Sequence, residues 1–505
     1  MIRSAKLKLS FCFSIFCALS FAQGGYDIRF NMKGNKDTIM YLVKYVWDQQ
    51  YIADTCKNIK NGQVVFKGKE DLDKGVYVLV SEAKSIYFDV FVNENQKFTI
   101  TCDNSDIVSS LKVTGNKENE TFFSYIKYIT NKNQEFGKFQ AQTKGMKKED
   151  STKFMLDKIN LMNGDVMKFE KDFMDRTKGT YVNDVMNLKT EKNPTDIPKA
   201  SNGRPDSVYQ YYWYKSHFFD GIDFTDDRII RTPFFDDRVK RYFESVILQA
   251  PDTVIQEIDK ILAKSKPDGL VYNLLIGHFT YKYEQDKRMG FDKVFVHLCD
   301  KYIISGKAKK VYDDETAKKI KERADILRNI LLDSKAPEIY MIDTIHGREV
   351  LKMGFDTAKT SESITKLYYK HVDKLTPWFK TVYGISAKYT VLVFWSVDCG
   401  HCQTEIPKLN EELKELKGKI DFKVISVYTK EDFEAWRKFI IDKKLDFINV
   451  FDPVHINDLK NKYDIYSTPV IYILDKDKKI KAKRLGSEQV IDMLKFFEKQ
   501  DELKK

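Results

Sequence analysis

Hydrophobic and polar residues alternate from Tyr26 to about Gly115, and this period of two predicts β-strands. The alternation is clearest in the segments YDIRFNM, TIMYLVKYV, GQVVFKG, GVYVLVS, YFDVFVN and KFTITCD. Turn residues such as Gly34-Asn35 separate them. Short strands at this spacing are typical of a small all-β sandwich or barrel. Because this part of the chain has no histidine, we interpret it as a packing or interaction module.

From about Asn116 to Leu332 the hydrophobic residues recur every three to four positions, which predicts helices. The period is seen in FFSYIKYI, FMLDKINLMNGDVMKFEKDFM, RVKRYFESVI, DTVIQEIDKILAKS, VYNLLIGHFTYKYE and ETAKKIKERADILRNIL. A loop rich in proline, glycine and asparagine interrupts the helices at 193–207. This region is therefore expected to be all-α.

An aromatic cluster follows that loop: Tyr209, Tyr211, Tyr212, Trp213, Tyr214 and His217. Exposed aromatic residues favour interfaces, so the cluster could form a peptide-binding surface. We favour the other interpretation, in which an aromatic helix is buried against its neighbours. His217, His278 and His297 lack the spacing of a metal site, and no metal is expected here.

Strands and helices alternate from residue 333 to the end of the chain. The apolar run YTVLVFW predicts a central strand buried on both faces, and CGHCQTEIPKLNEELKELKGK predicts an amphipathic helix. The segments DFKVISVYT, DFINVFD and VIYILDKDKKI predict further strands. This order predicts an α/β domain with a mixed sheet. The predicted organisation is a β-rich domain at 23–115, a helical domain at 116–332 and an α/β domain at 333–505.

Residues 1–22 have the pattern of a cleavable secretory signal peptide. Three basic residues precede the apolar run FCFSIFCALSFA, which is shorter than the ~20 residues that a membrane-spanning helix needs. No later segment could span a bilayer. We therefore expect a mature chain that is soluble and exported.

The composition is that of a soluble globular protein, with 42% hydrophobic and 31% charged residues. The net charge is +11, but lysine and arginine are scattered among 74 acidic residues. Since no nucleic-acid-binding motif or P-loop is present, the positive charge is best explained by solvated lysine-rich faces. Nucleic acid is not an expected partner.

Five cysteines lie beyond the predicted signal peptide: Cys56, Cys102, Cys299, Cys399 and Cys402. Such low density excludes a disulfide-rich scaffold. Cys56 and Cys102 either pair within the β-rich domain or remain as isolated strand cysteines. Cys299 has the surroundings of a buried helical residue. Cys399 and Cys402 alone are close in sequence, in the segment FWSVDCGHCQTEIP.

Three roles are open to the pair Cys399 and Cys402. A zinc site needs four ligands, and apart from His401 no partner cluster is visible. A structural disulfide would close too short a loop to constrain the unfolded chain. A redox pair fits better, because the N-terminus of a helix favours a thiolate. Cys399 would then attack a substrate disulfide, and Cys402, one turn deeper, would resolve the mixed disulfide.

The segment from about Ser334 to the end resembles the thioredoxin superfamily, and within it the exported TlpA-like and ResA-like thiol–disulfide oxidoreductases of bacteria. The resemblance rests on APEIYMID, VLVFWSVDCGHCQTEIPKL and YDIYSTPVIYILDKDKKI. It implies a thioredoxin-like fold with a cis-proline, Pro469, opposite the cysteines. It also implies that Thr468, Pro469 and Trp395 contact the substrate, and that Cys399 and Cys402 form a reversible disulfide.

Three further positions bear on the chemistry that the resemblance implies. Val393 stands where cytosolic thioredoxins have a buried acid. Glu405 falls where the TlpA-like and ResA-like reductases carry a glutamate, and it either tunes or relays the proton of the deeper thiol or forms a surface salt bridge. The dipeptide Gly400-His401 resembles that of protein disulfide isomerases. A histidine at that place stabilises the thiolate and moves the potential toward ~−180 mV, away from the ~−270 mV of thioredoxin.

The signal-peptide pattern and the resemblance together predict a thiol–disulfide oxidoreductase that is secreted across the inner membrane into the periplasm. It would exchange disulfides with protein substrates and a redox partner protein, without a cofactor. Its direction, as reductase, oxidase or isomerase, stays open. The segments before the α/β domain more loosely resemble uncharacterised accessory domains of larger periplasmic proteins. The alternative is a binding or assembly protein in which those segments hold a partner and the thioredoxin-like fold serves as a scaffold.

Overall fold

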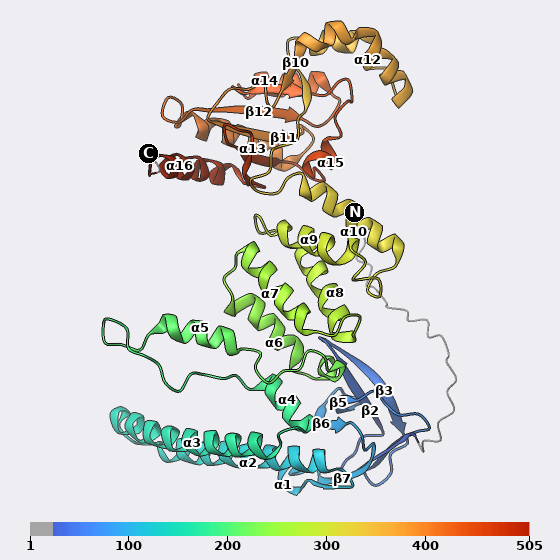
Figure 1. Ribbon diagram of the computed structural model, residues 1–505, viewed down its shortest axis with the longest axis vertical. Helices are drawn as coiled ribbons and strands as arrows, with labels where there is room; N and C mark the ends of the chain where they lie inside the picture. Colours follow the sequence, from blue (N-terminus) through green and yellow to red (C-terminus); the bar gives the residue numbers. More distant parts are fainter. Residues whose placement is uncertain (1–23, 504–505) are drawn as a thin grey trace. The chain divides into compact units, whose positions relative to one another are not determined.

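The computed structural model describes residues 24–503 (Figure 1). The predicted signal peptide, residues 1–22, lies outside this range. The described chain forms two compact units, of which the first ends at Val246 and the second begins at Ile247. Their β, helical and mixed α/β parts confirm the predicted multidomain fold class.

Two four-stranded sheets form the β-rich part of the first unit, in the orders β4-β1-β7-β8 and β3-β2-β5-β6. Neighbouring strands are antiparallel except for β1 and β7, which are parallel. The strands are β1 Tyr26–Lys33, β2 Ile39–Val46, β3 Gln49–Lys57, β4 Gln63–Gly68, β5 Gly75–Ser81, β6 Ile86–Val92, β7 Lys97–Asp103 and β8 Lys112–Thr114.

The period of two in the sequence is the period of burial in these strands. In β1, Ile28, Phe30 and Met32 are buried in the core between the sheets, whereas Arg29 and Asn31 between them are exposed. The two cysteines of this domain lie in different sheets, Cys56 on β3 and Cys102 on β7, and both are free thiols.

Three helices of the first unit, α2, α3 and α4, pack on the outer face of the sheet that holds β5 and β6. Val76 on β5 and Phe91 on β6 share a core with Val185 and Met186 of α4, which explains why β5 is buried on both faces. The side-chain amide of Asn119 on α2 accepts a hydrogen bond from the Phe91 N–H and donates one to the Phe91 C=O. These two backbone groups of the edge strand β6 therefore have hydrogen-bond partners. The helices are α1 Ile107–Ser110, α2 Lys117–Gln142, α3 Lys148–Arg176, α4 Tyr181–Lys189, α5 Ser207–His217, η1 Asp227–Arg231, α6 Phe235–Arg241 and η2 Tyr242–Val246.

The aromatic cluster forms a helix, α5, but the favoured interpretation that this helix is buried is wrong. No residue of α5 is buried, and 62% of the surface of both Val208 and Tyr212 is exposed. Tyr209 and Tyr211 are exposed as well. The cluster is therefore a surface feature.

The second unit begins with a helical segment that leads into a mixed α/β domain. Pro251 occupies the first turn of α7, where its missing N–H costs nothing. Cys299 is fully buried in a helical turn, as predicted. The helices are α7 Pro251–Lys264, α8 Leu270–Glu284, α9 Asp292–Leu298, η3 Cys299–Ile304 and α10 Asp314–Arg328.

A seven-stranded mixed sheet forms the centre of the α/β domain, in the order β10-β9-β13-β12-β11-β14-β15. The strands β11, β12 and β13 are parallel, and the other neighbours are antiparallel. The strands are β9 Tyr340–Asp343, β10 Phe379–Thr381, β11 Tyr389–Trp395, β12 Phe422–Tyr428, β13 Ile448–Phe451, β14 Val470–Leu474 and β15 Ile480–Lys483.

Helices cover this sheet and complete its core. Every residue of β11 is buried, as its continuous apolar run predicts. Val391, Val393 and Trp395 share one core with α13, α14 and α16, whereas Phe394 packs against Tyr463 of α15. The helices are α11 Gly347–Val350, η4 Leu351–Phe355, α12 Ser361–Leu375, η5 Thr376–Trp378, α13 Gly400–Lys414, α14 Phe433–Asp442, α15 Leu459–Tyr463 and α16 Ser487–Leu503.

Candidate active site

The two cysteines lie where β11 ends and α13 begins. Cys399 is the N-cap residue of α13, with an extended backbone, and its Sγ accepts a hydrogen bond from the backbone N–H of Cys402 at 3.3 Å. The unpaired N–H groups of the first helical turn thus point toward the Cys399 sulfur. Cys402 is fully buried, and Cys399 is half-buried. One thiol is therefore accessible and the other lies beneath it.

Thr468 and Pro469 lie directly against Cys399, because β14 runs antiparallel to β11. Val470, the first residue of β14, is opposite Phe394 near the end of β11. The Thr468–Pro469 peptide bond that precedes it is cis. The Cys399 thiol donates a hydrogen bond to the Thr468 carbonyl at 3.1 Å, and the Ser396 and Thr468 hydroxyls are 3.5 Å apart.

The surroundings of the two sulfurs shift their pKa values in opposite directions. Burial opposes ionisation of the Cys399 thiol, but hydrogen bonds with the side chains of Cys402 and Thr468 and with the backbone of Cys402 and His401 together hold its pKa below the ordinary value. Burial, and then the hydrogen bond with Cys399, raise the pKa of the Cys402 thiol to about 11. The pair can therefore hold a thiolate on the outer sulfur and a proton on the inner one.

The structure separates the remaining predicted site residues. His401 is exposed on the first turn of α13. Glu405 accepts a hydrogen bond from the Ser487 hydroxyl at 2.9 Å and another from its backbone N–H at 3.3 Å, at the start of α16. Its described contacts thus join α13 to α16 and do not include either cysteine.

Trp395, which the sequence suggests as a substrate contact, is fully buried instead. Its indole N–H donates to the Ser426 hydroxyl at 2.7 Å, and its ring packs against Tyr428 and Phe439. The sequence of β11 is an almost continuous apolar run, and all of its residues are buried. The sequence pattern therefore could not show which face of the sheet each side chain occupies. Trp395 supports the strand that leads to the cysteines and offers no surface to a substrate.

Polar residues that the sequence did not single out also border the site. Asp398, next to Cys399, faces the ammonium of Lys430 at 3.9 Å. Lys430 in turn lines a pocket of about 250 Å³ at the carboxyl end of β13, together with Phe433 and Asp452. Within residues 24–503, no group of three or more histidine, cysteine, aspartate or glutamate side chains is arranged to hold a metal ion.

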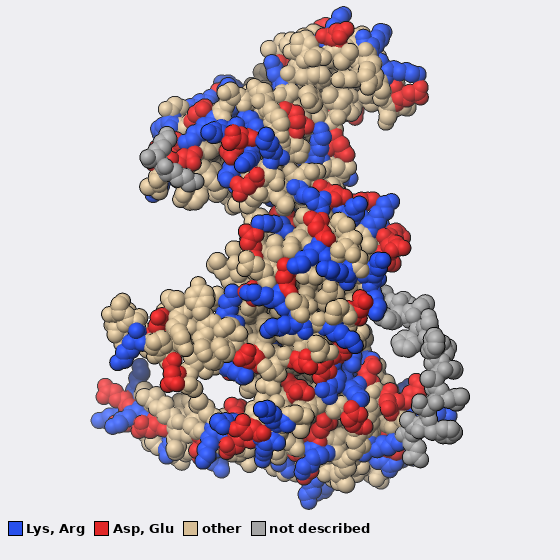
Figure 2. Space-filling model, viewed as in Figure 1, with Lys and Arg blue, Asp and Glu red and all other residues tan. Residues whose placement is uncertain are grey.

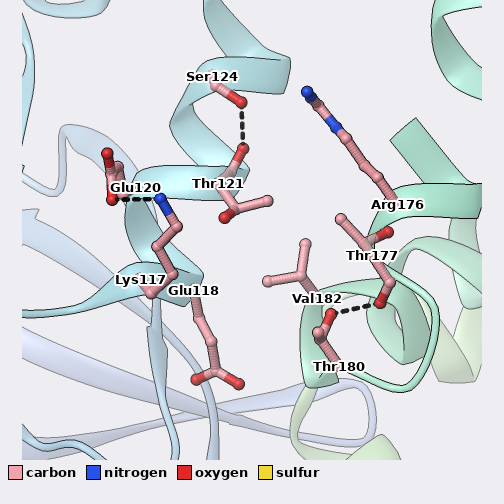
Figure 3. A pocket seen from close by; sticks show the side chains of 9 residues that line it. All are labelled: Lys117, Glu118, Glu120, Thr121, Ser124, Arg176, Thr177, Thr180 and Val182. Atoms are coloured by element: carbon pink, nitrogen blue, oxygen red, sulfur yellow. Dashed lines mark hydrogen bonds and ion pairs between the residues drawn. The ribbon is translucent and has the colours of Figure 1, made fainter. Parts of the chain in front are cut away.

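A separate pocket of about 450 Å³ lies in the first unit, between the starts of α2 and α4 (Figure 3). Its lining includes Lys117, which pairs with Glu120 at 3.0 Å, and Arg176, but no cysteine or histidine. Charges of both signs intermingle on the surface seen in Figure 2, as the scattered sequence positions of lysine and arginine suggest. No helix of the described chain is both long and apolar enough to span a bilayer.

Comparison with known proteins shows which family the region that holds the cysteines resembles. Residues 380–483 match the AhpC/TSA family. A crystallised domain of a possible thiol-disulfide isomerase from Cytophaga hutchinsonii is 36% identical, over 34% of this chain and 97% of that one, with a TM-score of 0.27. The C-terminal region is a thioredoxin-superfamily domain. Below, the thioredoxin domain means the elements from β9 to α16.

Other solved structures extend the comparison. A thioredoxin-like protein from Bacteroides caccae is 15% identical over 60% of this chain and 98% of its own, with a TM-score of 0.35. A thiol:disulfide interchange protein from Bacteroides sp. is 24% identical over 34% of this chain and 91% of its own, with a TM-score of 0.25.

The thioredoxin domain follows accessory segments that match families of unknown function. Residues 26–122 match DUF4369, and residues 175–329 match DUF5106. No curated protein matches the chain.

Proposed function

We propose that the protein is an exported thiol–disulfide oxidoreductase of the TlpA-like and ResA-like kind, which exchanges disulfides with polypeptides in the periplasm. The observation that carries the proposal is the setting of Cys399. Its sulfur caps a helix, accepts from the Cys402 N–H, and contacts the Thr468 carbonyl beside a cis-proline. The helix N-terminus and the Cys402 N–H favour the thiolate, which is the nucleophile in disulfide exchange.

The proposed reaction has two steps. The Cys399 thiolate attacks one sulfur of a substrate disulfide, a mixed disulfide forms, and the other substrate sulfur leaves as a thiolate that takes a proton from water. Cys402 then loses its proton and attacks the Cys399 sulfur, which forms the Cys399–Cys402 disulfide and releases the second substrate thiol. Two electrons pass from the pair to the substrate. A redox partner protein returns them, and with an oxidising partner the same steps run in reverse.

Thr468 and Pro469 are proposed to form the substrate groove. Both are half-buried, so part of each remains available to a polypeptide next to Cys399. His401 is proposed to stabilise the thiolate from the helix surface. Glu405 is proposed as a proton relay for Cys402 only if its carboxylate leaves Ser487, since that hydrogen bond now orients it.

The test is a redox titration of the mature chain in mixtures of reduced and oxidised glutathione. We expect a single two-electron transition between about −270 and about −120 mV, and a value near about −180 mV would favour an isomerase or oxidant. Thiols are counted by mass after alkylation under denaturing conditions, with buried Cys299 as an internal control that stays reduced. A pair that does not cycle with glutathione contradicts the proposal.

The exposed face of α5 supports a second candidate function, the binding of a polypeptide partner by the accessory segments. Val208 and Tyr212, one helical turn apart, are the most exposed apolar residues of α5. Exposed tyrosines on a rigid element are common anchors of interfaces. In this function the thioredoxin domain would serve as a scaffold, or it would act on polypeptides that the accessory segments bind.

Replacing both Val208 and Tyr212 with serine is expected to weaken polypeptide binding about tenfold or more, since hot-spot tyrosines each contribute ~2 kcal/mol. The measurement is fluorescence anisotropy with a labelled, unfolded polypeptide that has no cysteine, so that exchange chemistry plays no part. Tyr281→Ser, which changes an exposed tyrosine on α8, is the control. Equal affinity for wild type, double variant and control would remove this candidate.

A further inference from the structure

The loop that carries Thr468 begins at Asp464, directly after α15. Asp464 has a left-handed backbone (φ 54°), and only 4% of its side chain is exposed. A buried carboxylate requires charged or hydrogen-bonding partners. Two arginines supply them: Arg484, which follows β15 within the thioredoxin domain, and Arg323 of α10.

Arg323 binds Asp464 through both ends of its guanidinium. Its Nη1 donates to one carboxylate oxygen, and its Nη2 donates to the other at 3.1 Å. Arg484 donates to the second oxygen as well. Paired hydrogen bonds of this kind fix the orientation of the carboxylate as well as its position. The aspartate is therefore held on both sides.

Arg323 comes from outside the thioredoxin domain. It lies on α10, within the segment that matches a domain of unknown function, and 141 residues separate it from Asp464. Helices α10 and α15 are in contact within the second compact unit. An accessory element thus reaches the loop that leads to the candidate active site.

The loop is short and its backbone is tied to the point where Arg323 binds. The Tyr466 N–H donates to the Asp464 carbonyl at 3.2 Å, and two residues later the Thr468 carbonyl accepts from Cys399. The Arg323 guanidinium also lies over the Tyr466 ring, 5.6 Å from its centroid. These contacts link Arg323, through Asp464 and the Tyr466 ring, to the segment that ends at Thr468.

We propose that Arg323 is a positioning residue for the candidate active site. It sets the place of the Asp464–Thr468 loop and so the path on which a substrate polypeptide lies beside Cys399. The helical segment before the thioredoxin domain is then part of the substrate-binding apparatus. This inference rests on the proposed oxidoreductase function. Tyr466, 58% exposed, would form the outer wall of the same path.

A second contact joins the helical segment to β15 without Arg323. The ammonium of Lys483 on β15 pairs with Asp292 of α9, and it donates to the Ile330 carbonyl at 2.6 Å. This contact does not involve Arg323. The effect of changing Arg323 is therefore expected at the loop, with the helices still in place.

The experiment compares Arg323→Gln with Arg328→Gln in the full mature chain. Arg328 is on the same helix, but its described partners are Asp300 and Asp325 of the helical segment. The substrate is a synthetic peptide with one intramolecular disulfide. We measure kcat and KM for its reduction, with dithiothreitol as the electron donor, and the rate at which iodoacetamide alkylates Cys399.

For Arg323→Gln we expect KM to rise about tenfold, because a misplaced loop weakens substrate alignment. We expect the alkylation rate of Cys399 to change much less than KM, because the helix N-terminus and the Cys402 N–H that favour the thiolate stay in place. Arg328→Gln should match wild type in both measurements. Arg323→Lys, which keeps one charged contact with Asp464, should fall between wild type and Arg323→Gln.

Each outcome decides a separate question. If wild type does not reduce the peptide, the proposed function fails. If wild type reduces it and Arg323→Gln has an unchanged KM, the positioning role is overturned while the function stands. Should Arg323→Gln not fold, Arg323→Lys decides in its place, and a KM equal to wild type overturns the proposal. Equal losses in Arg323→Gln and Arg328→Gln would also overturn it.

Discussion

Serine in place of Cys399 is expected to lower kcat/KM for a peptide disulfide by at least about a thousandfold, because the nucleophile is lost. Serine in place of Cys402 is expected to stop the reaction halfway. The Cys399 thiolate still attacks, but no second thiol resolves the product, so a mixed disulfide accumulates. The measurement combines turnover with mass spectrometry of the unreduced protein, in which Cys402→Ser carries the added mass of the peptide.

The thiol pKa values provide the control for this prediction. Cys299 is buried, and burial raises its pKa to about 11, so Cys299→Ser should retain wild-type turnover. At neutral pH, iodoacetamide should label Cys399 and spare Cys402, because the pKa of the first is lowered and that of the second is raised to about 11. Turnover that survives in Cys399→Ser would contradict the assignment of the nucleophile.

Lys483→Met is expected to lower the free energy of unfolding by about 3–5 kcal/mol, because it leaves Asp292 buried without its charge partner. Only 3% of the Lys483 side chain and 9% of the Asp292 side chain are exposed. Burial lowers the pKa of Lys483, which is the cost that its pairing with Asp292 offsets. The measurement is urea-induced unfolding followed by tryptophan fluorescence.

The same strand offers a matched control. Lys481 pairs with Asp333 at the surface, so Lys481→Met should cost less than about 1 kcal/mol. The double variant Lys483→Met/Asp292→Leu should recover most of the loss, since an apolar pair removes the unpaired charge. Equal costs for Lys483→Met and Lys481→Met would show that the buried pair does not hold the helical segment to β15.

Local patterns in the sequence predicted the elements and much of the cysteine setting. The alternation in β1 predicted the burial of Ile28, Phe30 and Met32. The apolar run before Cys399 predicted a strand buried on both faces, and the residues after it predicted the helix. These features depend on neighbours within one turn or one strand, so a local pattern contains the information.

Features that depend on distant residues could not be predicted in this way. The pairs Arg323–Asp464 and Lys483–Asp292 join residues 141 and 191 positions apart, and neither has a sequence signature. Periodicity in α5 predicted a helix but not its exposure, because a period does not state what covers an apolar face. The helical period likewise runs on across Val246 and Ile247, where the first compact unit ends and the second begins in the chain.

Val393 has a consequence for how long a client stays attached. It is fully buried in the same core as Cys402, and its apolar side chain cannot take up the proton of the inner thiol. Burial is the largest cause of the raised pKa of the Cys402 thiol and persists in the mixed disulfide, so only a small fraction of that thiol is ionised at neutral pH. Release of the client would then be the slow half of the cycle, faster by about tenfold for each pH unit. The lifetime of the mixed disulfide with the client would therefore depend on the pH of the compartment.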